Sequence, residues 1–197
     1  MKHIRLLSAL CLSIAFADAA VADNATKQFA VEGPGRLDCT AFAAARKDKG
    51  SAEYQRLIGF VEGYLSAANR YEPNTFDLTP WHNAVAFDLI LDKHCTANPT
   101  EALVSVVQKM VGALRPIRVA EFSPLVEVGA GKDRAFVYKS ILQRTQAALR
   151  QRGLFKGEED GVYSAQLRKS LIDFQRGTKL DQTGVPDPAT LWTLLNP

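Results

Sequence analysis

Residues that could perform acid, base or metal chemistry are few and widely spaced in this 197-residue chain. After a short leader-like start, the histidines are His82 and His94, and no His-Glu-x-x-His arrangement accompanies them to form a zinc site. The chain also has no Gly-x-Ser-x-Gly nucleophile elbow. Glu53 and Glu62 carry the group that a glycosidase acid needs, although solvated helix glutamates are the commoner interpretation. The residue types therefore predict no enzyme activity, no metal site and no cofactor.

The first residues carry the pattern of an export signal. A short basic head precedes the apolar run 6–16, and residues 20–22 have the small-x-small pattern that signal peptidase reads. Cleavage is expected before Asp23, which makes residues 1–22 a signal peptide. The apolar run is much shorter than the roughly 20 residues that span a bilayer. The sequence therefore predicts a periplasmic protein with no membrane span after cleavage.

Removal of the leader leaves two cysteines, Cys39 and Cys95, in a compartment where disulfides form. We expect them to pair, and the enclosed loop of about 57 residues implies roughly 4 kcal/mol of stabilisation on the chain-entropy model. Two unrelated buried thiols are the alternative. No Cys-x-x-Cys pair is present, so neither a redox motif nor a zinc motif is expected.

Apolar residues at helical spacing predict four helices between residues 38 and 114. Each is preceded by a residue that can cap free helical amides. The expected caps are Asp38, Ser51, Thr79 and Asn98. Pro80 supports the third start, and Glu101 is placed to complete a capping box at the fourth. The apolar residues expected on the third helix are Trp81, Val85, Leu89 and Ile90. With its disulfide, this region predicts a stapled helical domain of residues 23–115.

The helical period fades over residues 116–136, where proline and glycine accumulate, so we expect an interdomain linker there. Part of it is expected to pack as an extended segment. Residues 137–197 then predict three helices, and a Gly-Val pair precedes both the second and the third. The predicted fold class is therefore all-α, with the stapled domain followed by a small three-helix domain that contains a weak internal repeat.

Several short motifs occur in order within the last third. They are Gln146, Gly153-Leu154-Phe155, Asp160-Gly161-Val162-Tyr163, Phe174-Gln175 and Thr183-Gly184-Val185. On these motifs, residues 138–195 resemble the peptidoglycan-binding domain of the PGBD-like type found on cell-wall hydrolases. The resemblance implies binding of the peptidoglycan stem peptide. Ser164 and Leu167 stand where that family usually has glycine and threonine, beside the surface it is thought to use for the wall peptide.

A stem peptide offers carboxylates and amides, so its receptor needs exposed amides, an apolar shelf and one or two cations. The candidate ligand-binding residues are Gly161, Tyr163, Ser164, Gln166, Arg168 and Arg176. Residues 137–197 hold 9 basic and 6 acidic side chains, a net charge of +3, whereas residues 23–136 hold 13 and 14, a net charge of −1. This asymmetry favours an anionic partner for the C-terminal domain.

The N-terminal domain has a weaker resemblance of its own. Its single disulfide, its Gly59-x-x-x-Gly63 helix and its Cys95-x-x-Asn98-Pro99 junction make residues 37–114 similar to small periplasmic proteins of the acid-stress chaperone (HdeA-like) and Rap1a-type immunity families. The first family implies chaperone activity at low pH, and the second implies neutralisation of a secreted effector. The two glycines are expected to let another helix pack closely.

Taken together, the sequence predicts an exported, noncatalytic protein that docks on peptidoglycan through its C-terminal domain while the N-terminal domain contacts a protein partner. A periplasmic acid-stress chaperone or immunity-like protein is the alternative, and a peptidoglycan hydrolase is the third interpretation. Nucleic-acid binding is disfavoured by export and by the lack of a continuous basic stripe.

Overall fold

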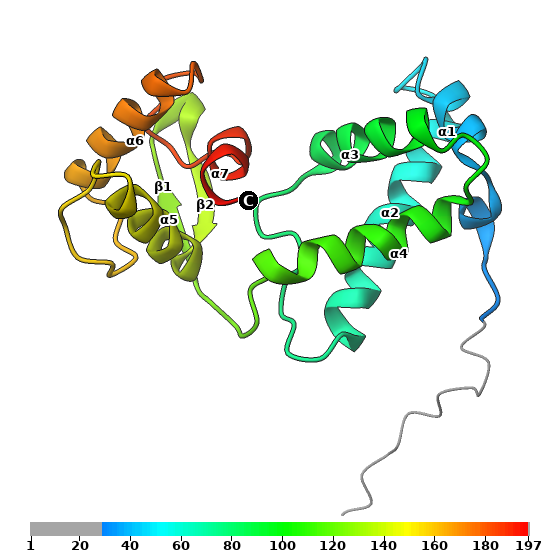
Figure 1. Ribbon diagram of the computed structural model, residues 1–197, viewed down its shortest axis with the longest axis horizontal. Coiled ribbons are helices and arrows are strands. Elements are labelled where there is room, and N and C mark those ends of the chain that lie inside the picture. The colour runs from blue at the N-terminus through cyan, green and yellow to red at the C-terminus, as the bar shows by residue number, and fades with distance from the viewer. Residues whose placement is uncertain (1–28, 197) are drawn as a thin grey trace, which may run out of the picture. The chain divides into compact units, whose positions relative to one another are not determined.

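A computed structural model describes residues 29–196, and the predicted leader lies outside the described residues. From Val31 on, the chain forms one compact unit. Figure 1 shows its helices and strands in chain order. The helices are α1 (Cys39–Ala45), α2 (Ala52–Tyr71), α3 (Ala84–Ala97), α4 (Leu103–Leu114), α5 (Lys139–Gln151), α6 (Ala165–Gly177) and α7 (Pro188–Leu195), and the strands are β1 (Leu125–Val128) and β2 (Ala135–Tyr138). The predicted α class is confirmed, with one small hairpin added.

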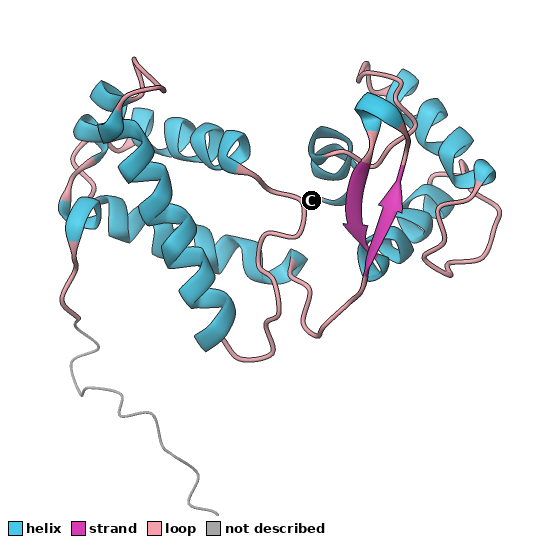
Figure 2. Cartoon of the chain, turned by 180° about the vertical axis from the view of Figure 1, so that it is seen from behind, coloured by secondary structure: helices cyan, strands magenta, loops and turns pink. Residues whose placement is uncertain are grey.

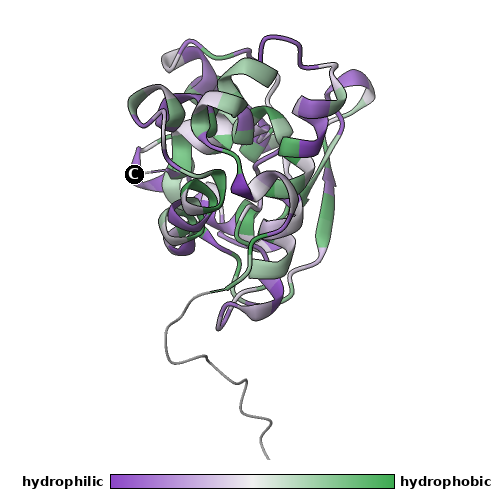
Figure 3. Ribbon diagram, turned by 90° about the vertical axis from the view of Figure 1, so that its right-hand side faces the viewer, coloured by the Kyte–Doolittle hydropathy of each residue, from purple (hydrophilic) through white to green (hydrophobic). Residues whose placement is uncertain are grey.

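Two hydrophobic cores lie within this unit. The first is formed by α1 to α4, and the second by α5 to α7 together with the hairpin. Polar and apolar positions, purple and green in Figure 3, interchange along the helices, as amphipathic helices around a core require. Among residues 29–196, no helix is both long and apolar enough to cross a membrane.

The predicted disulfide is present and joins the start of α1 to the end of α3. Cys39 and Cys95 have an S–S distance of 2.07 Å, and both residues are buried in the first core. The predicted caps of the first two helices are also confirmed. Asp38 Oδ1 accepts the Ala41 N–H at 2.9 Å, and Ser51 caps α2 in the same manner.

The predicted start of the third helix is wrong. The helix begins later, after Asn83, whose side chain accepts the N–H of Ala86 at 3.1 Å. Residues 79–82 form a tight turn instead, in which the His82 N–H donates to the Thr79 carbonyl oxygen at 3.0 Å. Trp81 consequently precedes the helix and packs into the second core.

The predicted capping box of the fourth helix is also wrong. Asn98 belongs to the end of α3, where its side-chain amide donates to the His94 carbonyl oxygen at 2.9 Å. The Glu101 carboxylate is held by the His94 ring at 2.9 Å and by Lys109 Nζ at 2.7 Å, so it does not turn back to cap a helix. α4 therefore starts after Ala102 without a side-chain cap.

The glycine pair of α2 does not mediate close helix packing. A Cβ added at Gly59 or at Gly63 would meet nothing within 4 Å, so both positions face open space. The expectation of a tight crossing at these residues is wrong.

Residues 116–136, predicted as a linker, contain β1 and the first part of β2. The two strands, the magenta arrows in Figure 2, pair antiparallel. Val126 lies opposite Val137. Val128 and Val137 are buried in the second core, which confirms that part of this segment packs in an extended conformation. Leu125 and Phe136 lie on the outer face and are exposed.

Candidate functional site

The first half of the predicted repeat is a loop, residues 160–164, that precedes α6. Buried Gln146 on α5 fixes this loop, because its Nε2 donates to Asp160 Oδ1 at 2.8 Å and its Oε1 accepts the Gly161 N–H at 2.8 Å. Gly161 has φ of 74°, and an added Cβ would lie 2.8 Å from the Lys139 carbonyl oxygen. The loop therefore has one defined shape, which only glycine at this position allows.

The second half repeats this arrangement ahead of α7. Buried Gln175 donates from Nε2 to the Thr190 hydroxyl at 2.9 Å and accepts the Gly184 N–H at 2.8 Å. Gly184 has φ of 70°, and Asp187 caps α7 by accepting the Thr190 N–H at 2.8 Å. Each half thus contains a buried glutamine, a glycine of positive φ and a capping residue, which confirms the predicted repeat.

Three candidate binding residues, Tyr163, Ser164 and Arg168, lie between the first loop glycine and the first turns of α6. The Tyr163 hydroxyl donates to the Gly184 carbonyl oxygen at 2.8 Å, so this tyrosine joins the two loops. Ser164 caps α6 by accepting the Leu167 N–H at 3.1 Å. Arg168 is exposed one turn further on, with its aliphatic stem against Gly184. Burial raises the pKa of Tyr163, and the positive charge of Arg168 opposes that rise.

Three of the four backbone amides of residues 161–164, which were expected to receive a ligand carboxylate, are engaged inside the protein. Gly161 donates to Gln146, Val162 donates to Asp160 Oδ1 at 2.9 Å, and Ser164 donates to the Val162 carbonyl oxygen at 3.0 Å. A wall peptide would therefore contact side chains at the start of α6 rather than these three amides.

The structure places the remaining two candidates elsewhere on α6. The side chain of Gln166 points toward Gly157, since its Oε1 is 3.0 Å from where a Cβ on that glycine would lie. Arg176 lies about two helical turns beyond Arg168. Its Nη1 donates to Asp173 Oδ1 at 2.9 Å.

Ser164 and Leu167, the two residues that differ from the family pattern, both have structural roles. Leu167 is fully buried in the second core, so it is interior packing and not part of the surface beside which it was expected. Ser164 supplies the cap of α6. Neither substitution disturbs the fold of this region.

The structure also contains a groove, of about 820 Å³, that the sequence did not predict. One wall is formed by Val85 and Leu89 of α3, which are 64% and 58% exposed. The opposite wall includes Pro188 and Trp192 of α7, and this tryptophan is 42% exposed. The buried face of α3 instead carries Phe87, Asp88, Leu91 and Cys95. Apolar spacing alone did not distinguish these two faces of the helix.

His82 lies among aromatic rings beside this groove. Its imidazole stacks on Trp81 at 5.6 Å and on Phe87 at 6.4 Å, and meets Trp192 edge-on at 5.2 Å, between ring centroids. Burial lowers the pKa of His82 to about 4, although the charge of Asp77 opposes the shift, so the ring is neutral at neutral pH. Within residues 29–196, neither ring nitrogen has a hydrogen-bond partner.

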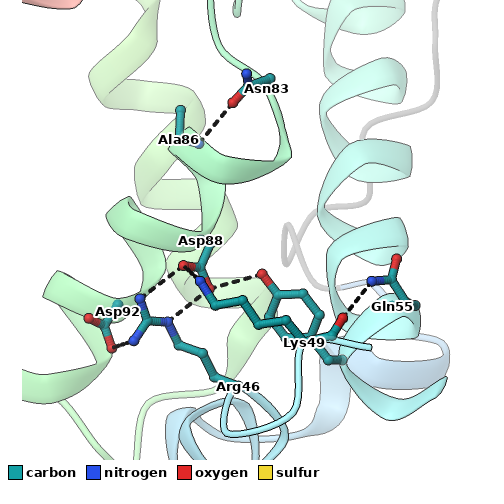
Figure 4. A network of polar contacts seen from close by, with 8 residues as sticks. Arg46, Lys49, Gln55, Asn83, Ala86, Asp88 and Asp92 are labelled. Atoms are coloured by element: carbon teal, nitrogen blue, oxygen red, sulfur yellow. Dashed lines mark hydrogen bonds and ion pairs between the residues drawn. The ribbon is translucent and has the colours of Figure 1, made fainter. Parts of the chain in front are cut away.

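A buried carboxylate organises the N-terminal helices (Figure 4). Asp88 on α3 accepts hydrogen bonds from Arg46 Nε at 2.8 Å, Lys49 Nζ at 2.7 Å and the Tyr54 hydroxyl at 2.9 Å. Asp92 contacts the same guanidinium at 3.1 Å. Burial would raise the pKa of Asp88, but these donors outweigh it and lower the pKa to about 2. The ionised group thus ties α1, α2 and α3 together.

The residues considered for catalysis do not converge. Glu53 and Glu62 are both exposed on α2. His94 bonds to Glu101, away from the aromatic surroundings of His82. In the described part of the chain, no three His, Cys, Asp or Glu side chains lie close enough together to hold a metal ion.

Comparison with known proteins identifies one segment of the chain. Residues 140–194 match the family model described as "Putative peptidoglycan binding domain", a stretch that begins in α5 and ends in α7. No curated protein and no solved structure matches the chain. The N-terminal resemblance to chaperone and immunity families is therefore unsupported. The match supports a C-terminal peptidoglycan-binding domain, peptidoglycan as a partner and a location in the cell envelope.

Proposed function

We propose that this is an exported, noncatalytic protein that docks on peptidoglycan through residues 137–197 and contacts a protein partner through its N-terminal helices. The observation that carries the proposal is the family match over residues 140–194. The intact core beneath it supports the same conclusion, since α5, α6 and α7 and both glutamine-fixed loops are fully formed.

The stem peptide is proposed to bind at the start of α6. Tyr163 offers a ring held in place by its bond to the second loop, and Arg168 offers an exposed cation one turn away. A guanidinium can bind a peptide carboxylate through two parallel hydrogen bonds. The excess of basic over acidic side chains in residues 137–197 favours the same anionic ligand.

Sedimentation with purified sacculi tests this proposal. The protein without its predicted leader should co-sediment, and Arg168→Glu should weaken binding about tenfold or more, as loss of one charged hydrogen bond implies. Lys156→Glu is the matched control, because Lys156 is another exposed cation of the same domain, in the loop between α5 and α6. It should bind nearly as well as the wild type. If both variants lost wall binding equally, binding would depend on the net charge of the domain and the proposed site would be wrong.

The same assay separates the alternatives. Wall fragments released into the supernatant would identify a hydrolase. Failure to sediment, together with suppressed client aggregation at acid pH, would favour the stress-chaperone function, and failure of both would favour an immunity-like protein. Binding without release supports a docking protein.

The protein partner is proposed to contact the N-terminal helices, whose surface includes exposed Leu37 and Tyr71. This part is tested separately by placing a photoreactive amino acid at Tyr71 and cross-linking in intact cells. A discrete cross-linked protein that disappears when the photoreactive group is moved to the exposed Glu62 would support it. Absence of any cross-link would contradict it without affecting wall binding.

A further inference from the structure

The groove between α3 and α7 combines apolar walls with a polar rim. Its apolar part includes Val85, Leu89 and the partly exposed indole of Trp192. The polar residues Thr183 and Thr193 also line it. Its volume of about 820 Å³ falls within the range of roughly 300–1,000 Å³ that is usual for small-molecule sites. A ligand here must present an apolar face to the indole and hydrogen-bonding groups to the rim.

The charges at the groove disfavour the acidic stem peptide. Asp181 and Asp187 line it on one side and Lys93 on the other, so the carboxylates outnumber the ammonium group. His82 adds no positive charge at neutral pH because its buried imidazole is neutral. Carboxylates and hydroxyls suit a neutral ligand that is rich in hydroxyl and amide groups.

An N-acetylated amino-sugar ring has these properties. Its C–H faces stack on aromatic rings, its hydroxyls and acetamido group form hydrogen bonds, and it carries no charge. The muramic carboxyl of peptidoglycan is consumed in its amide link to the stem peptide, so the substituted glycan strand is also neutral along its sugars. The groove wall from Leu180 to Thr193 lies inside the segment that matches the peptidoglycan-binding family.

We propose that this groove binds the glycan strand of peptidoglycan, with a sugar ring stacked on Trp192. The site is separate from the stem-peptide residues at the start of α6, although the inference rests on the proposed wall-docking function. Half of the lining residues come from α3 and the segment just before it, so wall binding by this protein uses its N-terminal part as well as its C-terminal domain.

The fluorescence of the chain's own tryptophans can report on ligand binding at this site. It contains two tryptophans, and both Trp81 and Trp192 line the groove. Tryptophan emission of the protein, titrated with soluble N-acetylglucosamine hexamer, should therefore change saturably. Calorimetry of Trp192→Ala should show affinity at least tenfold weaker, because a stacked aromatic is usually a dominant contact. Phe136→Ala is the control, since Phe136 is an aromatic residue outside the groove that is even more exposed than Trp192, and the affinity of this variant should be unchanged.

Parallel sedimentation with sacculi keeps the outcomes distinct. If sacculi bind but the hexamer gives no saturable change, the glycan proposal is wrong while wall docking stands. If neither binds, both proposals fail. If Trp192→Ala bound the hexamer with unchanged affinity, the sugar would bind elsewhere and the groove proposal would be wrong. An emission change caused by free stem peptide, or by raising protein concentration alone, would assign the groove to a peptide or to a second copy.

Discussion

Replacing Asp88 with asparagine should destabilise the protein in a way that depends on pH. The substitution keeps the shape of the side chain but removes the charge that Arg46, Lys49 and Tyr54 hold. The pKa of Asp88 is about 2 in the folded protein, against about 3.9 for an aspartate in an unfolded chain. That difference corresponds to about 2–3 kcal/mol of stability at neutral pH.

The sign follows from proton linkage. Because the folded pKa is the lower one, the stabilisation is fully present above the unfolded pKa and is lost as the pH falls through about 2. The wild type should therefore be more stable than Asp88→Asn by about 2–3 kcal/mol at about pH 7, and this difference should nearly vanish close to pH 2.

Urea unfolding followed by far-UV circular dichroism, at several pH values, measures this difference. Asp92→Asn is the matched control: Asp92 contacts the same guanidinium at 3.1 Å, but its side chain is 41% exposed. Its loss should stay below about 1 kcal/mol, as for other surface ion pairs. A difference that did not change with pH, or an equal loss from Asp92→Asn, would refute this account of the buried charge.

The remaining predictions concern glycines and the aromatic cluster, and all can be measured by urea or thermal unfolding. Gly161→Ala should destabilise by more than about 1 kcal/mol, because φ is 74° and the new Cβ would lie 2.8 Å from a carbonyl oxygen. Gly63→Ala should instead stabilise by about 0.5–1 kcal/mol, since its Cβ would meet nothing within 4 Å on a helix. His82→Phe should stabilise by about 1 kcal/mol at neutral pH by removing buried, unpaired nitrogens. Its advantage should grow as the pH falls from 6.5 toward about 4, where the unfolded histidine takes up a proton before the folded one. A smaller advantage at the lower pH would contradict the His82 reasoning.

Local chemistry made several helix starts predictable from the sequence. Asp38, Ser51, Ser164 and Asp187 each accept a backbone N–H three residues further on, which requires no information from distant parts of the chain. Thr79 and Asn98 have equally suitable side chains. They do not cap the predicted helices because the chain makes a tight turn after Thr79 and because Asn98 still belongs to the end of α3, where its N–H donates to the His94 carbonyl oxygen.

Sequence patterns could not predict the hairpin or the groove, for two different reasons. Strands of four residues are too short for alternation to stand out, particularly beside exposed Leu125 and Phe136. The groove is built from α3 and α7, whose residues are far apart in the chain. Spacing within one helix shows that an apolar stripe exists, but only the packed structure shows which stripe is covered.

The internal repeat explains how the C-terminal domain can contribute to both of the proposed binding surfaces. Gly161 and Gly184 occupy equivalent loops, so Ser164 corresponds to Asp187 as the cap of the helix that follows. Packing fixes those shared positions, and they are similar in both halves. The exposed residues of the two helices are not constrained by that core, and they differ in chemistry.

Five residues after its cap, each of these helices has an exposed side chain: Lys169 on α6 and Trp192 on α7. A cation at this position, next to Arg168, suits the charged stem peptide, whereas an indole suits the uncharged face of a sugar ring. The Tyr163 hydroxyl and the Gly184 carbonyl oxygen join the loops that precede the two helices, and this bond supports a fixed relation between the two proposed surfaces. A polymer that carries both stem peptides and sugars can then gain affinity from both surfaces at once, since binding at one raises the effective concentration at the other.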